Sequence, residues 1–239
     1  MRRAKEHLDA FDSASDAFFR DDPHTFVSQV GKKPDEYIVR IRGVKVVPVD
    51  MALIAGDAIF NMRSYLDHMT YAFWHSEDAQ FPVFATSKSF DDWGRRRIKG
   101  TSDAFKALVE GLQPYQSGNG GKLNLLWLLN ELSNADKHRT LHLSSVSLVG
   151  SGYRSLITRD CNVRMQSPIF KGMLKDGTEM CRVRIARTGP KPEMQVHLAL
   201  ALAICFNEFG PGRGQIVADM LLKIYEYIDS ILPQFENIL

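Results

Sequence analysis

Polar side chains suited to hydrogen bonding and proton transfer follow one side of an otherwise apolar stretch, residues 51–75. On a helix that turns about 100° per residue, five of them fall within about 40° of one line: Asp57, Asn61, Ser64, His68 and His75. The stretch contains no Lys and no Glu, the residues that usually make a helix face soluble. An acid, an amide, a hydroxyl and two imidazoles therefore predict a recognition or proton-transfer site.

A second polar stripe is expected on a helix over residues 122–142, where Asn130, Asn134 and His138 follow an i, i+4, i+8 course. If the two stripes face each other, they form one pocket lined by Asp57, Asn61, His68, Asn134 and His138. Two structural alternatives stay open. The stripes can be a buried, hydrogen-bonded network without a ligand, and Lys137, His138 and Arg139 can simply be cations favoured by the dipole at the end of a helix.

The segment from Arg63 to His68, RSYLDH, resembles the Arg-x4–6-His motif of the HEPN superfamily, helical-bundle proteins that include toxin and antiviral ribonucleases. The resemblance implies metal-independent cleavage of RNA phosphodiesters, in toxin action or phage defence. Arg63 would bind the scissile phosphate and His68 would transfer protons for attack by the RNA 2′-hydroxyl. Lys137 or Arg139 would supply further donors. It also implies a homodimer that brings two such motifs together.

Helix geometry and a neighbouring acid qualify this motif. Five residues correspond to about 500° of rotation, so Arg63 and His68 lie about 140° apart on a regular helix. They share a phosphate only if the helix is distorted or a second protomer contributes. Arg63 also stands four residues before Asp67, a spacing typical of a helix ion pair. A catalytic role predicts that Arg63→Ala and His68→Ala abolish cleavage while the melting temperature stays within a few degrees.

A metal-dependent bundle enzyme is the second hypothesis, because His138 and His142 stand one helical turn apart. With His68 as a third ligand, the set resembles the three-histidine arrangement of DinB and YfiT-like bundle proteins. The ribonuclease hypothesis itself needs no metal and no cofactor. Its supporting residues are Asp57, Asn61, Ser64, Asp67, Asn134, Lys137, His138 and Arg139.

Two groups of cations suggest a third hypothesis, a binding protein without catalysis. One group is the run of Arg95, Arg96, Arg97 and Lys99, and the other is the strand-like set of Arg182, Arg184 and Arg187. Either group would contact an acidic partner or an RNA backbone, and binding would then weaken with salt. Trp93 and Phe90 stand next to the first group, where they would stack on bases or pack in the core.

Bulk composition indicates a soluble globular protein. The chain has 239 residues, of which 44% are hydrophobic and 24% charged, and its net charge of +2 gives no global attraction to nucleic acid or membrane. Three dispersed cysteines predict free thiols in a reducing compartment. The charged N-terminal segment and a longest apolar run of nine residues, 198–206, predict a cytoplasmic protein without a membrane span.

The periodicity predicts one α+β domain over residues 1–239, a helical bundle with β-hairpin or sheet insertions. Its main helices are expected at residues 3–20, 51–75, 122–142 and 215–231. Shorter helices are expected at 90–99 and 102–112, and strands in 24–48 and 143–206. The chain carries no Gly-x-Ser-x-Gly, Walker-type or Rossmann glycine motif, which disfavours serine-hydrolase, ATP-driven and dinucleotide chemistry.

Overall fold

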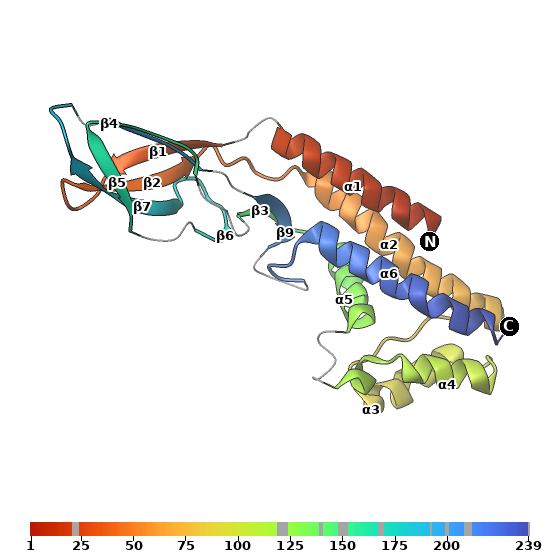
Figure 1. The fold of residues 1–239 in the computed structure, drawn as a ribbon. Helices are drawn as coiled ribbons and strands as arrows, with labels where there is room; N and C mark the ends of the chain where they lie inside the picture. Colours follow the sequence, from red (N-terminus) through yellow and green to blue (C-terminus); the bar gives the residue numbers. More distant parts are fainter. Residues whose placement is uncertain are drawn as a thin grey trace. The chain divides into compact units, whose positions relative to one another are not determined.

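The computed structural model of the protein describes residues 1–20, 24–118, 124–138, 141–147, 153–166, 170–191, 193–198, 201–207 and 212–238. The described helices are α1 (Arg2–Arg20), α2 (Val49–Trp74), α3 (Ser87–Ser89), α4 (Asp103–Gly111), α5 (Leu125–His138) and α6 (Val217–Glu236) (Figure 1). The strands are β1 (Thr25–Val30), β2 (Glu36–Arg42), β3 (Leu143–Ser147), β4 (Tyr153–Arg159), β5 (Cys161–Met165), β6 (Gly172–Met173), β7 (Glu179–Arg187), β8 (Glu193–Leu198) and β9 (Leu202–Phe206).

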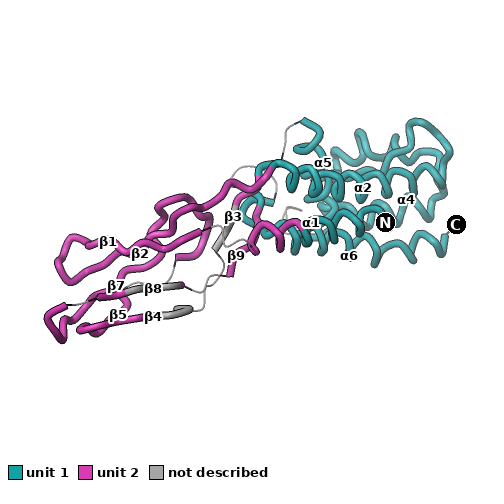
Figure 2. Tube along the Cα trace, turned by 90° about the horizontal axis from the view of Figure 1, so that it is seen from above, with its two compact units in different colours: residues 1–13, 49–142, 206–239 teal, residues 14–48, 143–205 magenta. Residues whose placement is uncertain are grey.

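The chain divides into two compact units (Figure 2). The helical unit comprises residues 1–13, 49–142 and 206–239, and the strand unit comprises residues 14–48 and 143–205. Each unit is thus assembled from segments that are distant in sequence. None of the helices in the described ranges is long and apolar enough to cross a membrane.

The helical unit is built on α2, which packs against α5 and α6. Nearly every third or fourth residue of α2 is fully buried, including Ala55, Ile59, Met62 and Leu66, as expected for a helix with a core face. Polar side chains fix where its partners begin. Ser102 accepts from the backbone N–H of Phe105 at the start of α4, and Asn124 accepts from the N–H groups of Leu126 and Trp127 at the start of α5.

The strand unit contains a four-stranded antiparallel sheet in the order β1-β2-β7-β5. The predicted hairpin is present: β1 and β2 pair, and the N–H of Gly31 donates to the carbonyl of Glu36 at 2.7 Å. Alternation along β2 and β7 places Val39, Ile41, Cys181 and Val183 in one buried cluster. Two smaller sheets pair β6-β3-β9 and β4-β8.

The predicted bundle of four main helices with β insertions is wrong, although the α+β mixture is present. The two strand-rich stretches were expected as insertions in the bundle. They instead pair with each other, β2 with β7, and bury a hydrophobic cluster of their own. Backbone pairing between distant segments satisfies both ladders and buries both apolar faces. Periodicity within one segment does not reveal that pairing.

Candidate functional site

Arg63, the predicted phosphate ligand, is buried within the helical unit, with 4% of its surface exposed. Its Nη2 donates to the carbonyl of Phe81 at 2.7 Å and lies 3.0 Å from Oδ1 of Asp67. The same carboxylate oxygen accepts from the N–H of Phe81 at 2.9 Å. Arg63 and Asp67 therefore bind the backbone carbonyl and N–H of Phe81, respectively. The geometry confirms the alternative prediction, an i,i+4 ion pair between Arg63 and Asp67.

Burial dominates the electrostatics of this pair. Burial lowers the pKa of Arg63, and the positive charge of Arg97 lowers it further. The negative charge of Asp67 partly offsets this lowering. Burial raises the pKa of Asp67, while Arg63, the N–H of Phe81, Lys137 and Arg97 all act in the opposite direction. Lys137 and Arg97 thus lie close enough to Asp67 for their charges to be felt. Nη1 of Arg63 is buried and has no hydrogen-bond partner among the described residues.

His68 lies in a different environment. It is exposed and lines a pocket formed with residues of α6, among them Leu232, Phe235 and Glu236. Arg63 instead contacts Phe81 and Asp67. The side chains of Arg63 and His68 therefore point in different directions from α2, as their spacing predicts for a regular helix. Within one chain, the structure does not bring Arg63 and His68 to a common point.

An acidic contact joins α2 and α5, the two helices on which the polar stripes were predicted. Asp136 contacts α2 at Gly56, where an added Cβ would lie 2.6 Å from its Oδ1. Burial raises the pKa of Asp136, and the negative charge of Asp57 raises it further. The stripe pattern did not single out Asp136, although a glycine inside a helix, as at position 56, can mark a close approach of another chain segment.

Most of the other predicted site residues are exposed. They are Asp57, Asn134, Lys137, His138 and His142. Asn61 is half-buried and donates to the carbonyl of Asp57 in its own helix at 2.7 Å, and Ser64 is also half-buried. Arg139 lies outside the described residues. Within the described part of the chain no three His, Cys, Asp or Glu side chains come close enough to hold a metal, so His68, His138 and His142 do not form such a group there.

The second group of predicted cations, on β7, is already engaged within the strand unit. Arg182 pairs with Glu179 and Glu36, and Arg184 pairs with Asp35 at 3.1 Å. Arg187, at the end of the strand, is exposed. Carboxylates of the sheet and of the turn before β2 therefore offset most of the charge that the arginine alternation suggested for a polyanion.

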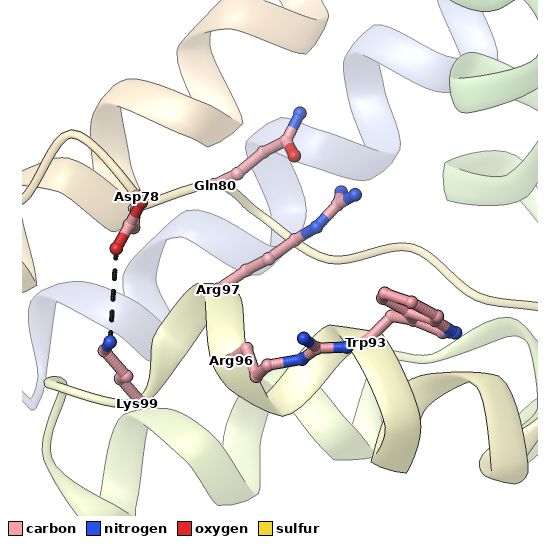
Figure 3. A pocket seen from close by; sticks show the side chains of 6 residues that line it. All are labelled: Asp78, Gln80, Trp93, Arg96, Arg97 and Lys99. Atoms are coloured by element: carbon pink, nitrogen blue, oxygen red, sulfur yellow. Dashed lines mark ion pairs between the residues drawn. The ribbon is translucent and has the colours of Figure 1, made fainter.

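The first group of cations lines a pocket of about 370 Å³ in the helical unit (Figure 3). The lining side chains are Asp78, Gln80, Trp93, Arg96, Arg97 and Lys99, and we call this the Trp93–Lys99 pocket. Three of the six are cationic and one is acidic. In Figure 3, Arg97 and Gln80 extend in the same direction, and Arg96 reaches along the chain toward Trp93.

Irregular backbone presents these side chains where a regular helix over residues 90–99 was expected. Phe90–Gly94 form a π-helical turn, in which the N–H of Arg95 donates to the carbonyl of Phe90, and Arg95–Ile98 continue as a 3₁₀ helix. Phe90 and Ile98 are buried and anchor both ends. At Gly94 an added Cβ would lie 2.6 Å from the ring of Phe90, so the turn needs glycine there. π turns inside helices are frequent at functional sites.

A backbone hydrogen bond connects the pocket to the buried Arg63–Asp67 pair. The N–H of Gln80 donates to the carbonyl of Arg97 at 3.3 Å, and the next residue, Phe81, is held by Arg63 and Asp67. The motif arginine thus positions the segment that supplies Gln80 to the pocket. Nothing in the sequence marks Gln80 or Asp78 as members of the site, because they become neighbours of Arg97 only through this chain reversal.

The cations of the pocket differ in how far they are neutralised. Arg95, just outside it, is held by Asp91 and Glu110. Lys99 lies 4.0 Å from Asp78, but both side chains are well exposed, and such pairs contribute little. Among the described residues neither Arg96 nor Arg97 has an ion pair. The pocket therefore has an excess of positive charge.

Aromatic rings accompany these cations. The guanidinium of Arg96 lies 4.3 Å from the ring centre of Trp93, and that of Arg97 lies 5.5 Å from the ring centre of Phe84. Trp93 is 58% exposed, whereas Phe90, its predicted companion in stacking, is fully buried. Phe90 is therefore a core residue, and Trp93 is the aromatic surface that a ligand can reach.

Comparison with known proteins found no matching family model, no matching curated protein and no matching solved structure. The fold and site define an α+β protein whose helical unit carries a cationic pocket with an accessible indole. The HEPN resemblance stays a prediction.

Proposed function

We propose that this protein binds single-stranded nucleic acid through the Trp93–Lys99 pocket. The observation that supports this most directly is an arginine without an ion pair among the described residues, Arg97, in the same pocket as an indole that is 58% exposed. A guanidinium offers fixed, paired donors to phosphate oxygens, and an exposed indole offers a face to a base. Gln80 adds an amide that can both donate to and accept from a base edge or sugar hydroxyl.

The combination favours a nucleotide chain over an acidic peptide. A peptide carboxylate would use the cations but would leave the exposed face of Trp93 without a partner. Single-stranded nucleic acid repeats a phosphate and a flat base along the chain, which matches cations next to an aromatic ring. The net charge of +2 over 239 residues indicates weak binding that depends on this local pocket.

The test is fluorescence anisotropy of 5′-labelled ten-nucleotide oligomers of RNA and of DNA against the whole chain, from about 50 to 300 mM NaCl. If Arg96, Arg97 and Lys99 each neutralise one phosphate, log K falls against log salt with a slope of about −2 for a single strand. Arg97→Gln is expected to reduce that slope to about −1.4 and to weaken binding about tenfold at low salt. Trp93→Ala is expected to weaken binding at least about fivefold.

The matched control is Arg2→Gln, which removes the same charge from an exposed residue of α1 that does not line the pocket. Equal losses in Arg2→Gln and Arg97→Gln would show binding by general charge and would overturn the proposal. RNA cleavage, the activity that the motif resemblance implies for Arg63 and His68, stays a prediction. The same RNA samples test it, because a cleaved oligomer loses anisotropy and runs faster on a gel.

A further inference from the structure

A second pocket of the helical unit, of about 310 Å³, lies between α2 and α6 and differs from the first in chemistry. Its walls are mainly apolar and include Met69, Ala72, Phe73, Leu232 and Phe235. At about 30 Å³ per water in the liquid, its volume corresponds to roughly ten waters. Pockets of this size with apolar walls and few polar groups are typical small-molecule sites. We call it the α2–α6 pocket.

Two phenylalanine rings that line the α2–α6 pocket, Phe73 and Phe235, pack against a third, Phe105, which does not line it. The ring of Phe73 lies 4.5 Å from that of Phe105, which lies 5.4 Å from that of Phe235. Phe105 and Phe235 are almost completely buried, so core packing holds the ring of Phe235 in place. Tyr65, also a lining residue, is half-buried. Aromatic faces carry negative electrostatic potential and attract cations.

Polar lining residues make the pocket negative. They are Tyr65, His68 and the exposed Glu236, and no Lys or Arg lines the pocket in the described part of the chain. Burial raises the pKa of Tyr65, and the negative charges of Glu236 and Asp229 raise it further, so both carboxylates act on this pocket. None of the ion pairs among the described residues uses Glu236. The carboxylate is therefore available to a ligand.

We propose that the α2–α6 pocket binds a small organic ammonium compound with an aromatic or alkyl body. The apolar walls bury the body, the aromatic rings favour the cation, and Glu236 fixes the ammonium end. The imidazole of His68 adds a second polar side chain to the same lining. This site shares no residue with the Trp93–Lys99 pocket and selects a ligand of opposite charge.

The experiment titrates the whole protein with three probes of one shape, followed by two-dimensional amide NMR. The probes are phenethylammonium, the uncharged 2-phenylethanol and the anionic 3-phenylpropionate. We expect shifts centred on the lining residues, with phenethylammonium binding about three- to tenfold more tightly than 2-phenylethanol and 3-phenylpropionate binding least. Equal affinities for the cation and the alcohol in the wild type would overturn the proposal.

Two variants separate the charge from the cavity. Glu236→Gln, at an exposed position, is expected to remove the preference for the cation while 2-phenylethanol still binds. Ala72→Trp, also at an exposed position, is expected to fill the pocket and abolish both. The matched control is Glu226→Gln, which removes the same charge from an exposed residue of α6 outside the lining. An unchanged preference in Glu236→Gln, or the same loss in Glu226→Gln, would contradict the assignment of Glu236.

Discussion

Replacing Arg63 by methionine tests whether the motif arginine is structural or catalytic. The change removes the buried hydrogen bond to the carbonyl of Phe81 and leaves Asp67 without its partner. Breaking a buried ion pair from one side costs about 3–5 kcal/mol. Because 28% of the Asp67 side chain is exposed, we expect the lower end of that range. About 3 kcal/mol corresponds to a fall in melting temperature of about 6–12 °C for a protein of this size.

A matched pair elsewhere in the chain provides the control. Arg2 and Glu6 have the same i,i+4 spacing as Arg63 and Asp67, but the Arg2 side chain is 82% exposed. Arg2→Met is therefore expected to cost about 0.2–0.5 kcal/mol, or at most about 2 °C. Thermal unfolding followed by circular dichroism measures both variants. Arg63→Met melting within about 2 °C of the wild type would refute the structural role, and lost RNA cleavage in that stable variant would establish the catalytic one.

Three further predictions concern other parts of the chain. Asp136→Asn should raise the melting temperature at pH 7 more than at pH 4. Burial and Asp57 raise the pKa of Asp136 above its unfolded value near 3.8, so ionising Asp136 lowers the stability of the folded protein as pH rises. An equal gain at both pH values, measured calorimetrically, would contradict this. Burial raises the pKa of Cys181 to about 11, so iodoacetamide at pH 8 should modify it only after denaturation, as peptide mass spectrometry would show; rapid labelling of the native protein would count against that burial. Gly94→Ala should cost about 1–3 kcal/mol in chemical denaturation, because the new Cβ would overlap the ring of Phe90, and an unchanged midpoint would argue against the π turn.

Local patterns in the sequence were sufficient to locate most elements of the fold. The apolar periodicity of residues 51–75 corresponds to α2 (Val49–Trp74), and the alternation around Arg182 and Arg184 corresponds to β7. Both signals are repeats that arise from the period of one element. The arrangement of the strands was not predictable in this way. Strands were expected within residues 143–206, but nothing in that stretch indicates that β8 and β9 belong to different sheets.

The candidate site shows the same division between local and distant information. The run of arginines and the neighbouring tryptophan are visible in the sequence, and Trp93, Arg96 and Arg97 do line the pocket. Asp91 and Glu110 form ion pairs with Arg95 and leave Arg96 and Arg97 without one in the described part of the chain. Glu110 is on α4, so the sequence around the arginines does not reveal this difference. Arg63 was given a chemical role because its type suits phosphate binding. The burial of Arg63 depends on Phe81, which comes into contact with Arg63 only because the chain reverses direction after α2.

The Trp93–Lys99 pocket depends on the number of residues between positions 90 and 98 as well as on which residues they are, because the segment contains the π turn at Phe90–Gly94. Phe90 and Ile98 are both buried, yet eight residues of regular α-helix would place them about 80° apart. In the structure a π turn is followed by a tighter 3₁₀ turn, and Trp93 and Arg97 both line the pocket. A chain with one residue fewer between positions 90 and 98 would rotate the downstream segment by about 100°. Such a chain would keep every aromatic and cationic residue and still lose the pocket. The length of this segment therefore determines the pocket as much as its composition does, and a one-residue deletion can remove it.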